Sequence, residues 1–485
     1  MKSLIKLAVI FLIFFFGCKT IGPDYREPEL KVKDTWNSAN RNQSLKILEK
    51  SETKEWWKNF NDQTLNELLD STIQNNLDIL VATSRIIEAK YNLGIKQAIL
   101  FPSLNASFSG TSLKNSNSVV PTVGGGNVGS IGSGIGGLQG GSNQRLELYS
   151  IGVDSSWEVD ILGKNKRAIE SSRAKMESIN ESHKDTLVSL TSEVTKNYIN
   201  YRGCITRLEL FRENEKIEKE TLSLIKIKVK AGFVGVKDLN RQEAQLFSSS
   251  SKIPDLERSC KEYLHKLVTL TGIEIINLES KLNSNSGIPV VQSKVSISVP
   301  AEILRHRPDL RKAEREIAEQ NAKIGQAIAE LFPKFSITGR TGIQTRTSSI
   351  GLDNLYYSLG PSISVPILEW GKYRNDIEVQ NEKCKQSLLN YQKLVLNAIE
   401  ETENAILAYE TEKINQELLD KEVTAYKNNL TYSKILYEKG ITDYLTLLDS
   451  QKSYYEVRDR QIQNSYKISL RVVNLYKVMG GGWEF

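Results

Sequence analysis

Four segments of the chain alternate apolar and polar residues with a period of two. In residues 149–159, one face carries Tyr, Ile, Val, Ser, Trp and Val, and the other carries Ser, Gly, Asp, Ser and Glu. The same alternation recurs in three further segments: 103–108, 334–344 and 357–367. Charged side chains within these segments fall on the polar face, and they include Asp154, Glu158 and Arg340. This pattern predicts four β-strands that each have one apolar and one polar face.

Most of the remaining chain has the apolar spacing of long helices. Residues 166–230 contain no proline, and at 1.5 Å per residue an unbroken helix would be about 95 Å long. Apolar residues recur in heptads at Leu187, Leu190, Val194, Tyr201, Cys204, Leu208 and Phe211, and again at Leu388, Tyr391, Val395, Ala398, Ala405 and Tyr409. Glycines lie near the expected reversals, at Gly232 and Gly440. We therefore predict two antiparallel helical hairpins, with a kink or junction near Pro254 in the first return helix.

These elements occur twice along the chain. Asp78 and Asp309 are separated by the same distance in sequence as Phe101 and Phe332, and a second, shorter spacing separates Gly163 from Gly371 and Gly232 from Gly440. The difference lies in a loop of the first copy, residues 115–144, which holds ten glycines and no charged residue. A repeated unit of long helices around a β-hairpin needs partner surfaces to bury its apolar faces. The pattern indicates a tube or shell and argues against a globular enzyme.

The N-terminus has the layout of a bacterial targeting segment. Lys2 and Lys6 precede an unbroken apolar run over 7–16, which is too short to span a bilayer, and Gly17 and Cys18 follow. This arrangement is similar to a lipoprotein signal, so we expect cleavage before Cys18 and a lipid on that residue; the alternative is an ordinary signal peptide with a chance cysteine. No other stretch approaches the roughly 20 apolar residues of a membrane helix, so any membrane-spanning element is expected to be β.

Four strands in one chain form neither a sandwich nor a closed barrel. A soluble sandwich, in which the apolar face is the core, is one interpretation of the alternation. The other is a transmembrane sheet, in which three chains contribute twelve strands and close the sheet.

Composition and motifs exclude several functional classes. The formal charge of +6 is spread along 485 residues, which does not favour nucleic-acid binding. The three histidines, His183, His265 and His306, have no metal-ligand spacing, and no HExxH, GxSxG or CxxC motif occurs. We predict no enzyme activity, no metal and no cofactor apart from the lipid on Cys18.

Cys204 and Cys260 lie on the facing sides of the first predicted helical hairpin. They are nearly equidistant in sequence from the reversal near Phe233, so they are expected to share one layer. An oxidising periplasm would permit a disulfide, and the alternative is two small buried side chains. Cys384 has no evident mate.

Motifs spread over nearly the whole mature chain occur in the order found in one family. They are 21–28 (IGPDYREP), Trp56-Trp57 with Phe60 and Asp62, 156–160 (SWEVD) before Gly163-Lys164, 305–310 (RHRPDL), 365–367 (VPI) before Gly371, 444–449 (YLTLLD) and 475–483 (LYKVMGGGW). On these residues the chain resembles the TolC-like outer-membrane efflux factors, in the NodT-type lipoprotein branch.

The resemblance implies an α+β membrane protein, internally duplicated, that assembles as a homotrimer. Long antiparallel coiled-coil helices would form a periplasmic α-helical barrel, and four strands per chain would join a shared twelve-stranded transmembrane β-barrel. Partners would be a periplasmic membrane-fusion adaptor, an inner-membrane RND-type transporter and outer-membrane lipid, with no nucleic acid. The function would be passive export of drugs, metal ions or other small solutes. A type I protein secretion duct and a surface lipoprotein with an adhesive or structural role are the alternatives, and no cargo is assigned.

The domain organisation expected on this basis has six parts. They are a signal peptide (1–17), a lipidated segment and equatorial belt (18–62), repeat 1 (63–271), an equatorial linker (272–300), repeat 2 (301–478) and a tail (479–485). Repeat 1 would hold a β-hairpin (103–160) with a long loop (113–147) and a helical hairpin (165–271), and repeat 2 would hold their counterparts (334–369 and 372–478).

The resemblance also places a periplasmic gate at the tips of the helical hairpins. Matched residue by residue, Asp449 occupies the position of an acidic ring, and Thr446 occupies a second position that is acidic in some members. Tyr437 and Lys452 match gate-locking side chains, and Asp238 matches an acidic position in the first copy. Three carboxylates near a three-fold axis would repel one another and attract cations. The alternative for Asp449 is a solvated carboxylate near a helix end.

Overall fold

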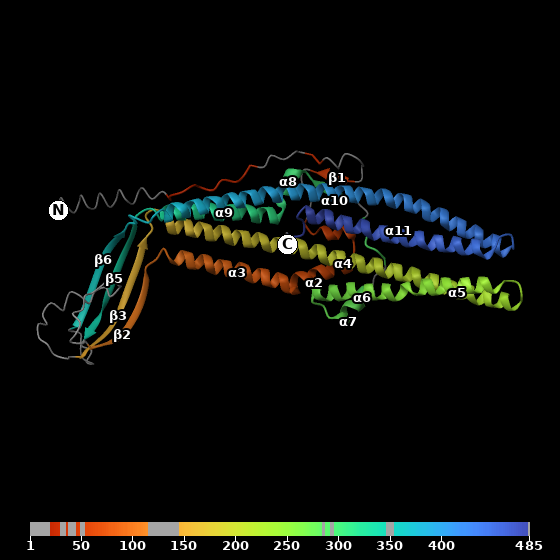
Figure 1. Ribbon diagram of the computed structural model, residues 1–485, viewed down its shortest axis with the longest axis horizontal. Helices are drawn as coiled ribbons and strands as arrows, with labels where there is room; N and C mark the ends of the chain where they lie inside the picture. The colour runs from red at the N-terminus through yellow and green to blue at the C-terminus, as the bar shows by residue number, and fades with distance from the viewer. Residues whose placement is uncertain are drawn as a thin grey trace. The chain divides into compact units, whose positions relative to one another are not determined.

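The computed structural model describes residues 20–29, 35–36, 45–48, 54–114, 145–283, 287–291, 295–345 and 354–483 (Figure 1). The signal segment, Cys18 and the glycine-rich loop (115–144) lie outside these residues. The chain divides into two compact units. One comprises Met1–Tyr25, Tyr91–Arg173 and Glu319–Lys383, and the other comprises Arg26–Lys90, Ala174–Ala318 and Cys384–Phe485.

The first unit contains an antiparallel sheet of four strands, in the order β2-β3-β5-β6 (Figure 1). The strands are β2 (Ser103–Lys114), β3 (Arg145–Val159), β5 (Lys334–Thr345) and β6 (Leu355–Ser364). Each copy of the repeat supplies one hairpin, and β3 pairs with β5 to join the two hairpins. Within the part of the chain that the structure describes, β2 and β6 each pair on one side only, so the sheet has two open edges.

The apolar face of this sheet is bare. Tyr357 is 83% exposed and Leu359 is 78% exposed. Further apolar side chains on the same face are also exposed: Leu104, Phe108, Ile151, Ile337, Leu355 and Ile363. The period-two alternation that predicts the strands thus separates an apolar surface from a polar one, and the described residues of one chain leave the apolar surface exposed.

Residues 21–24 of the N-terminal segment pack around the Arg167 side chain in the same unit. The Arg167 side chain is almost fully buried and donates through Nε to the Ile21 carbonyl at 3.1 Å, and through Nη2 to the Gly22 carbonyl at 3.2 Å and to Asp24 Oδ1 at 2.8 Å. Gly22 has a φ of 97°, and a Cβ there would lie 2.5 Å from the Gly325 Cα. Only glycine combines this backbone conformation with such a close approach.

The long helices repeat with the same lengths in both halves. Helices α3 (Leu77–Ala98) and α9 (Pro308–Ala329) each have 22 residues, and helices α4 (Lys164–Lys230) and α10 (Lys372–Glu438) each have 67. The return helix is continuous in the second copy, as α11 (Tyr444–Val478), and is split in the first copy into α5 (Val236–Ser250) and α6 (Lys252–Thr271).

The split in the first return helix has a local cause. Pro254 lies in the first turn of α6, where its missing N–H removes no helical hydrogen bond.

Among the described residues, no helix is long and apolar enough to cross a bilayer.

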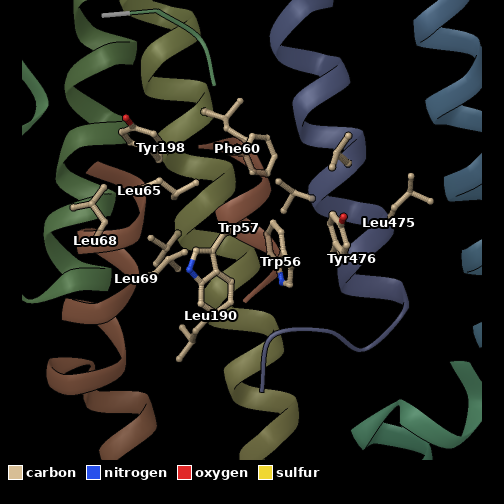
Figure 2. Packing of buried hydrophobic residues seen from close by; sticks show 14 of the residues in the cluster. Trp56, Trp57, Phe60, Leu65, Leu68, Leu69, Leu190, Tyr198, Leu475 and Tyr476 are labelled. Atoms are coloured by element: carbon tan, nitrogen blue, oxygen red, sulfur yellow. The ribbon is translucent and has the colours of Figure 1, made fainter. Parts of the chain in front are cut away.

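The second unit has its core around a tryptophan pair (Figure 2). Trp56 and Trp57 belong to a short 3-10 helix, η1 (Trp56–Phe60), and both are buried. The Trp56 ring stacks on Tyr476 of α11 at 5.1 Å between centroids. Leu65, Leu68 and Leu69 of α2 (Gln63–Asn75) complete this core against α4, at Leu190 and Tyr198. The smaller elements of this unit are α7 (Ile275–Asn283), α8 (Pro300–His306) and a parallel pair, β1 (Leu45–Leu48) with β4 (Val295–Ser298).

A buried polar network ties the start of α2 to α4. The Tyr198 hydroxyl donates to Asp62 Oδ2 at 2.8 Å and accepts from Arg202 Nε at 3.0 Å. Arg202 also donates to the Leu282 carbonyl at 2.7 Å, and Asp62 Oδ1 caps α2 by accepting from the Leu65 N–H. Burial raises the pKa of Tyr198, so the phenol keeps the proton that it donates.

A disulfide joins Cys204 of α4 to Cys260 of α6, with the Cα atoms 5.6 Å apart and a sequence separation of 56. Leu208 and Leu256 pack against the bond, and both cysteines are buried. Cys384 is a free, half-buried thiol. Of the two alternatives that the sequence leaves open for Cys204 and Cys260, the structure has the bonded pair.

We expect peptide mapping of the non-reduced protein to recover the Cys204 and Cys260 peptides as one cross-linked species. Replacing both cysteines with serine should lower the free energy of unfolding by about 2–4 kcal/mol, because the bond restricts the unfolded chain. Cys384→Ser is the matched control and should leave stability within about 0.5 kcal/mol of the parent. Complete alkylation of Cys204 and Cys260 without a reductant would contradict the bond.

Candidate gate at the tips of the helical hairpins

Each long helix of the second unit reverses through the same backbone motif. Gly232 after α4 and Gly440 after α10 have φ values of 75° and 71°. In the first tip the Phe233 N–H donates to the Lys228 carbonyl, and in the second the Ile441 N–H donates to the Leu436 carbonyl, both at 2.9 Å. These are Schellman caps, in which a left-handed glycine satisfies the last helical carbonyls. The duplication therefore produces two tips of matching geometry, one in each copy.

Two side-chain contacts join the tip of the first hairpin to the second. Lys228 Nζ of α4 donates to the Tyr437 hydroxyl of α10 at 3.3 Å and lies 4.6 Å from the centre of the Tyr437 ring. The Tyr444 hydroxyl at the start of α11 donates to Gln242 Oε1 of α5. The centres of the Tyr437 and Tyr444 rings lie 5.8 Å apart. Opening the two hairpins relative to each other would have to break these polar contacts.

A buried carboxylate lies behind the Tyr444 contact. Glu218 Oε1 accepts from Asn214, Gln245 and Ser249, at 3.1, 3.2 and 2.9 Å. Gln242, which accepts from Tyr444, also donates to the Glu218 backbone carbonyl at 3.1 Å. Burial raises the pKa of Glu218. The first hairpin thus holds Gln242 in place for Tyr444 through a set of polar contacts within α4 and α5.

Thr446 has a role in starting α11. Asp443 Oδ1 accepts from the Thr446 N–H at 3.0 Å and from its hydroxyl at 2.6 Å, which caps the helix. The hydrogen bond from the Thr446 hydroxyl lowers the pKa of Asp443. Thr446 therefore supplies a hydroxyl to the helix cap, and Asp443 is the carboxylate at this end of α11.

Asp449, Lys452 and Asp238, also proposed for the gate, form no hydrogen bond or ion pair with one another among the described residues. Asp449 is exposed on α11 and forms no hydrogen bond or ion pair with the described residues. Lys452, one turn further on, is exposed and lines a cavity of about 360 Å³ between α4, α5 and α11. Asp238, in the first turn of α5, lies 3.9 Å from Arg241 of the same helix. Among the described residues of one chain, Tyr437 is the one of the five whose side chain bonds to the opposite hairpin.

Sequence reasoning missed three residues of this site: Lys228, Gln242 and Tyr444. The heptad pattern tells which residues face inward within a hairpin, and it carries no information about contacts between hairpins from different copies. The equal spacing of the two tips was the available signal, because it places both hairpin ends at one level.

A bidentate ion pair joins the two hairpins further from the tips. Arg207 of α4 donates to both carboxylate oxygens of Asp459 of α11, at 2.6 and 3.0 Å. Over the described residues, no group of three or more His, Cys, Asp or Glu side chains is placed to hold a metal ion. The side chains at the tips supply hydrogen bonds and charges.

Comparisons with known proteins match most of the chain. The family model described as outer membrane efflux protein matches residues 68–273 and 299–481. Nodulation protein T of Rhizobium leguminosarum bv. trifolii is 30% identical over 452 residues, which is 91% of this chain and 90% of that protein. The cation efflux system protein CusC of Escherichia coli O157:H7 is 24% identical over 476 residues and covers 96% of both chains.

A solved structure of the outer-membrane channel OprN has the same fold. Its TM-score is 0.82 at 29% identity, with 96% of this chain and all of that chain covered. Family model, relatives and fold agree over both halves of the sequence, and the chain belongs to the outer membrane efflux protein family.

Proposed function

We propose that this protein is the exit duct of a tripartite efflux pump, through which small solutes cross the outer membrane passively. The observation that carries the proposal is the sheet with a bare apolar face and two open edges, in a chain of the outer membrane efflux protein family. A lipid bilayer would cover such a face.

We infer that three copies assemble around one pore. Unpaired backbone groups are costly in a bilayer, so the open edges of β2 and β6 need strands from neighbouring copies. Four strands per copy give twelve in a closed sheet. The paired helical hairpins of the three copies would line the continuation of the pore in the periplasm.

We propose that a periplasmic adaptor and an inner-membrane transporter deliver solute to this duct. Residues 18–62, 272–300 and 479–485 would form a belt around the helices, which the pairing of β1 with β4 supports because these strands come from two of the three segments. Cleavage before Cys18 would leave a lipid at the N-terminus. No cargo class follows from the residues described.

The hairpin tips would close the pore at rest. In the trimer, three copies of Asp449 would approach the axis and bind cations, and Lys452 and Asp238 would add charges near the ring. The Lys228–Tyr437 and Tyr444–Gln242 contacts would hold each second hairpin against the first hairpin. An adaptor that separates these pairs would open the duct.

We expect Asp449→Ala to weaken block by divalent cations. Loss of three carboxylates at short range should raise the blocking concentration about tenfold or more, and single-channel current should rise. Recording of purified protein in planar bilayers measures both. Glu456→Ala, two turns further along α11, is the matched control and should behave like the parent. Protein that never conducts, even as Asp449→Ala, would favour a structural spacer.

We expect loss of the contact between Lys228 and Tyr437 to favour the open pore. Tyr437→Phe removes the hydrogen bond and Lys228→Ala removes the whole contact, so each should raise the open fraction by about 2- to 10-fold. If the two residues act as a pair, the double variant should open little more than Lys228→Ala alone. Tyr432→Phe on the same helix is the control, since Tyr432 is 67% exposed. Additive effects would show that Lys228 and Tyr437 act independently.

Native mass spectrometry of detergent-extracted protein should give a trimer whose chains begin at Cys18 with attached lipid. Cys18→Ser should lose the lipid while the trimer persists, because the sheet edges rather than the lipid hold the copies together. A monomer that stays monodisperse without detergent and keeps its full strand content would contradict the proposed assembly.

A further inference from the structure

We propose that the ion pair of Asp154 and Arg340 sets the charge balance of the pore at the level of the sheet, and so makes these two residues determinants of ion selectivity. This inference rests on the proposed conduit. It concerns a part of the pore separate from the hairpin tips.

The two side chains lie in one row across the sheet. Asp154 of β3 pairs directly with Arg340 of β5, and Asp154 Oδ1 lies 2.8 Å from Arg340 Nε. Asn105 of β2 and Ser358 of β6 complete the row in register. Each chain thus contributes one carboxylate and one guanidinium at a single level, between uncharged neighbours at the two edges.

The polar face of the sheet is the face that would line the pore. The opposite face exposes large apolar side chains, which a bilayer would cover. On the polar face, hydroxyls pair across strands: Ser109 with Ser150 at 2.8 Å, and Ser336 with Ser362 at 2.7 Å. Ser107 also donates to Asp154 Oδ2 at 3.2 Å, which holds the carboxylate on this face.

The adjacent row carries no charge. It contains Ser107, Gly152, Gly342 and Tyr356, and the Tyr356 side chain lies close to both glycines. A Cβ at Gly342 would come within 3.1 Å of that ring, and one at Gly152 would come within 3.1 Å of its hydroxyl. The side chain of Arg340, by contrast, is 56% exposed. The Asp154–Arg340 pair is therefore surrounded by uncharged neighbours on this face, and the Arg340 side chain projects beyond them.

Other charges on this face lie toward the helical end of the sheet. Glu158 is four residues along β3 from Asp154, with its carboxylate 4.0 Å from Lys164. Lys334, at the start of β5, lies 2.6 Å from Glu330. These charges also have opposite partners, so removing one member of the Asp154–Arg340 pair would leave a net charge at a known level.

The charge balance of this row can be measured as ion selectivity, because an unpaired charge in a pore favours ions of the opposite sign. Three copies of an unpaired carboxylate would favour cations, and three unpaired guanidinium groups would favour anions. The Debye length is about 10 Å at 0.1 M salt and about 3 Å at 1 M. The effect of each charge should therefore be large in dilute salt and small in concentrated salt.

The test uses full-length trimers that carry Asp449→Ala, so that the gate carboxylates do not mask the sheet. Potassium and chloride permeabilities are compared from reversal potentials under a potassium chloride gradient at about 0.1 M. Arg340→Gln should raise the potassium-to-chloride ratio about twofold or more, and Asp154→Asn should lower it by a similar factor. The exchanged double variant, Asp154→Arg with Arg340→Asp, keeps the pair and should return the parent ratio.

A second set of variants leaves the ion pair intact. Ser358→Asp adds a negative charge to the same row and should raise the potassium-to-chloride ratio, whereas Ser358→Lys adds a positive charge and should lower it. Because the ion pair stays in place in both variants, the test does not depend on variants that break it. All shifts should shrink at about 1 M salt. Conducting variants that all keep the parent ratio would overturn this inference and leave the conduit standing. Trimers that never conduct would contradict the proposed function, and this inference with it.

Discussion

The sheet edges impose the constraint on which the other features depend. A strand edge and an apolar face are tolerable in water only when something covers them, and in lipid only when every backbone group is paired. Among the residues that the structure describes, β2 and β6 each pair on one side only, and Tyr357 and Leu359 are exposed on the apolar face. Pairing with further copies and contact with lipid would resolve both problems together, and would leave the polar face to surround the proposed pore.

Duplication gives the chain two hairpins of equal length with different internal supports. Three pairs of left-handed glycines share one spacing along the sequence: Gly163 and Gly371, Gly232 and Gly440, and Gly272 and Gly480. The pairs mark the starts, the tips and the ends of the two hairpins. Between these points the copies differ, since α5 and α6 are separate helices and α11 is continuous.

Much of the fold follows from local pattern, because period two and heptad spacing are properties of each segment alone. The alternation in 334–344 predicts β5, which covers Lys334–Thr345, and the fold class follows from four such segments and two long hairpins. Contacts between the two copies were not predictable in this way. Lys228 and Tyr437 meet across 209 positions, and Tyr444 and Gln242 meet across 202. The position of each hairpin against the other decides these contacts, and local periodicity does not encode it.

The disulfide between Cys204 and Cys260 makes the two hairpins mechanically unequal. At the corresponding positions of the second copy, found with the spacing of the glycine pairs, stand Glu412 and Ile468. There Asn464 donates to the Glu412 carbonyl at 3.0 Å, and Arg471 lies 3.4 Å from the Glu412 carboxylate. A covalent bond resists load that would pull hydrogen bonds apart, so at this level α4 and α6 should separate less readily than α10 and α11. Any motion that parts the two helices of a hairpin is accordingly easier in the second copy than in the first.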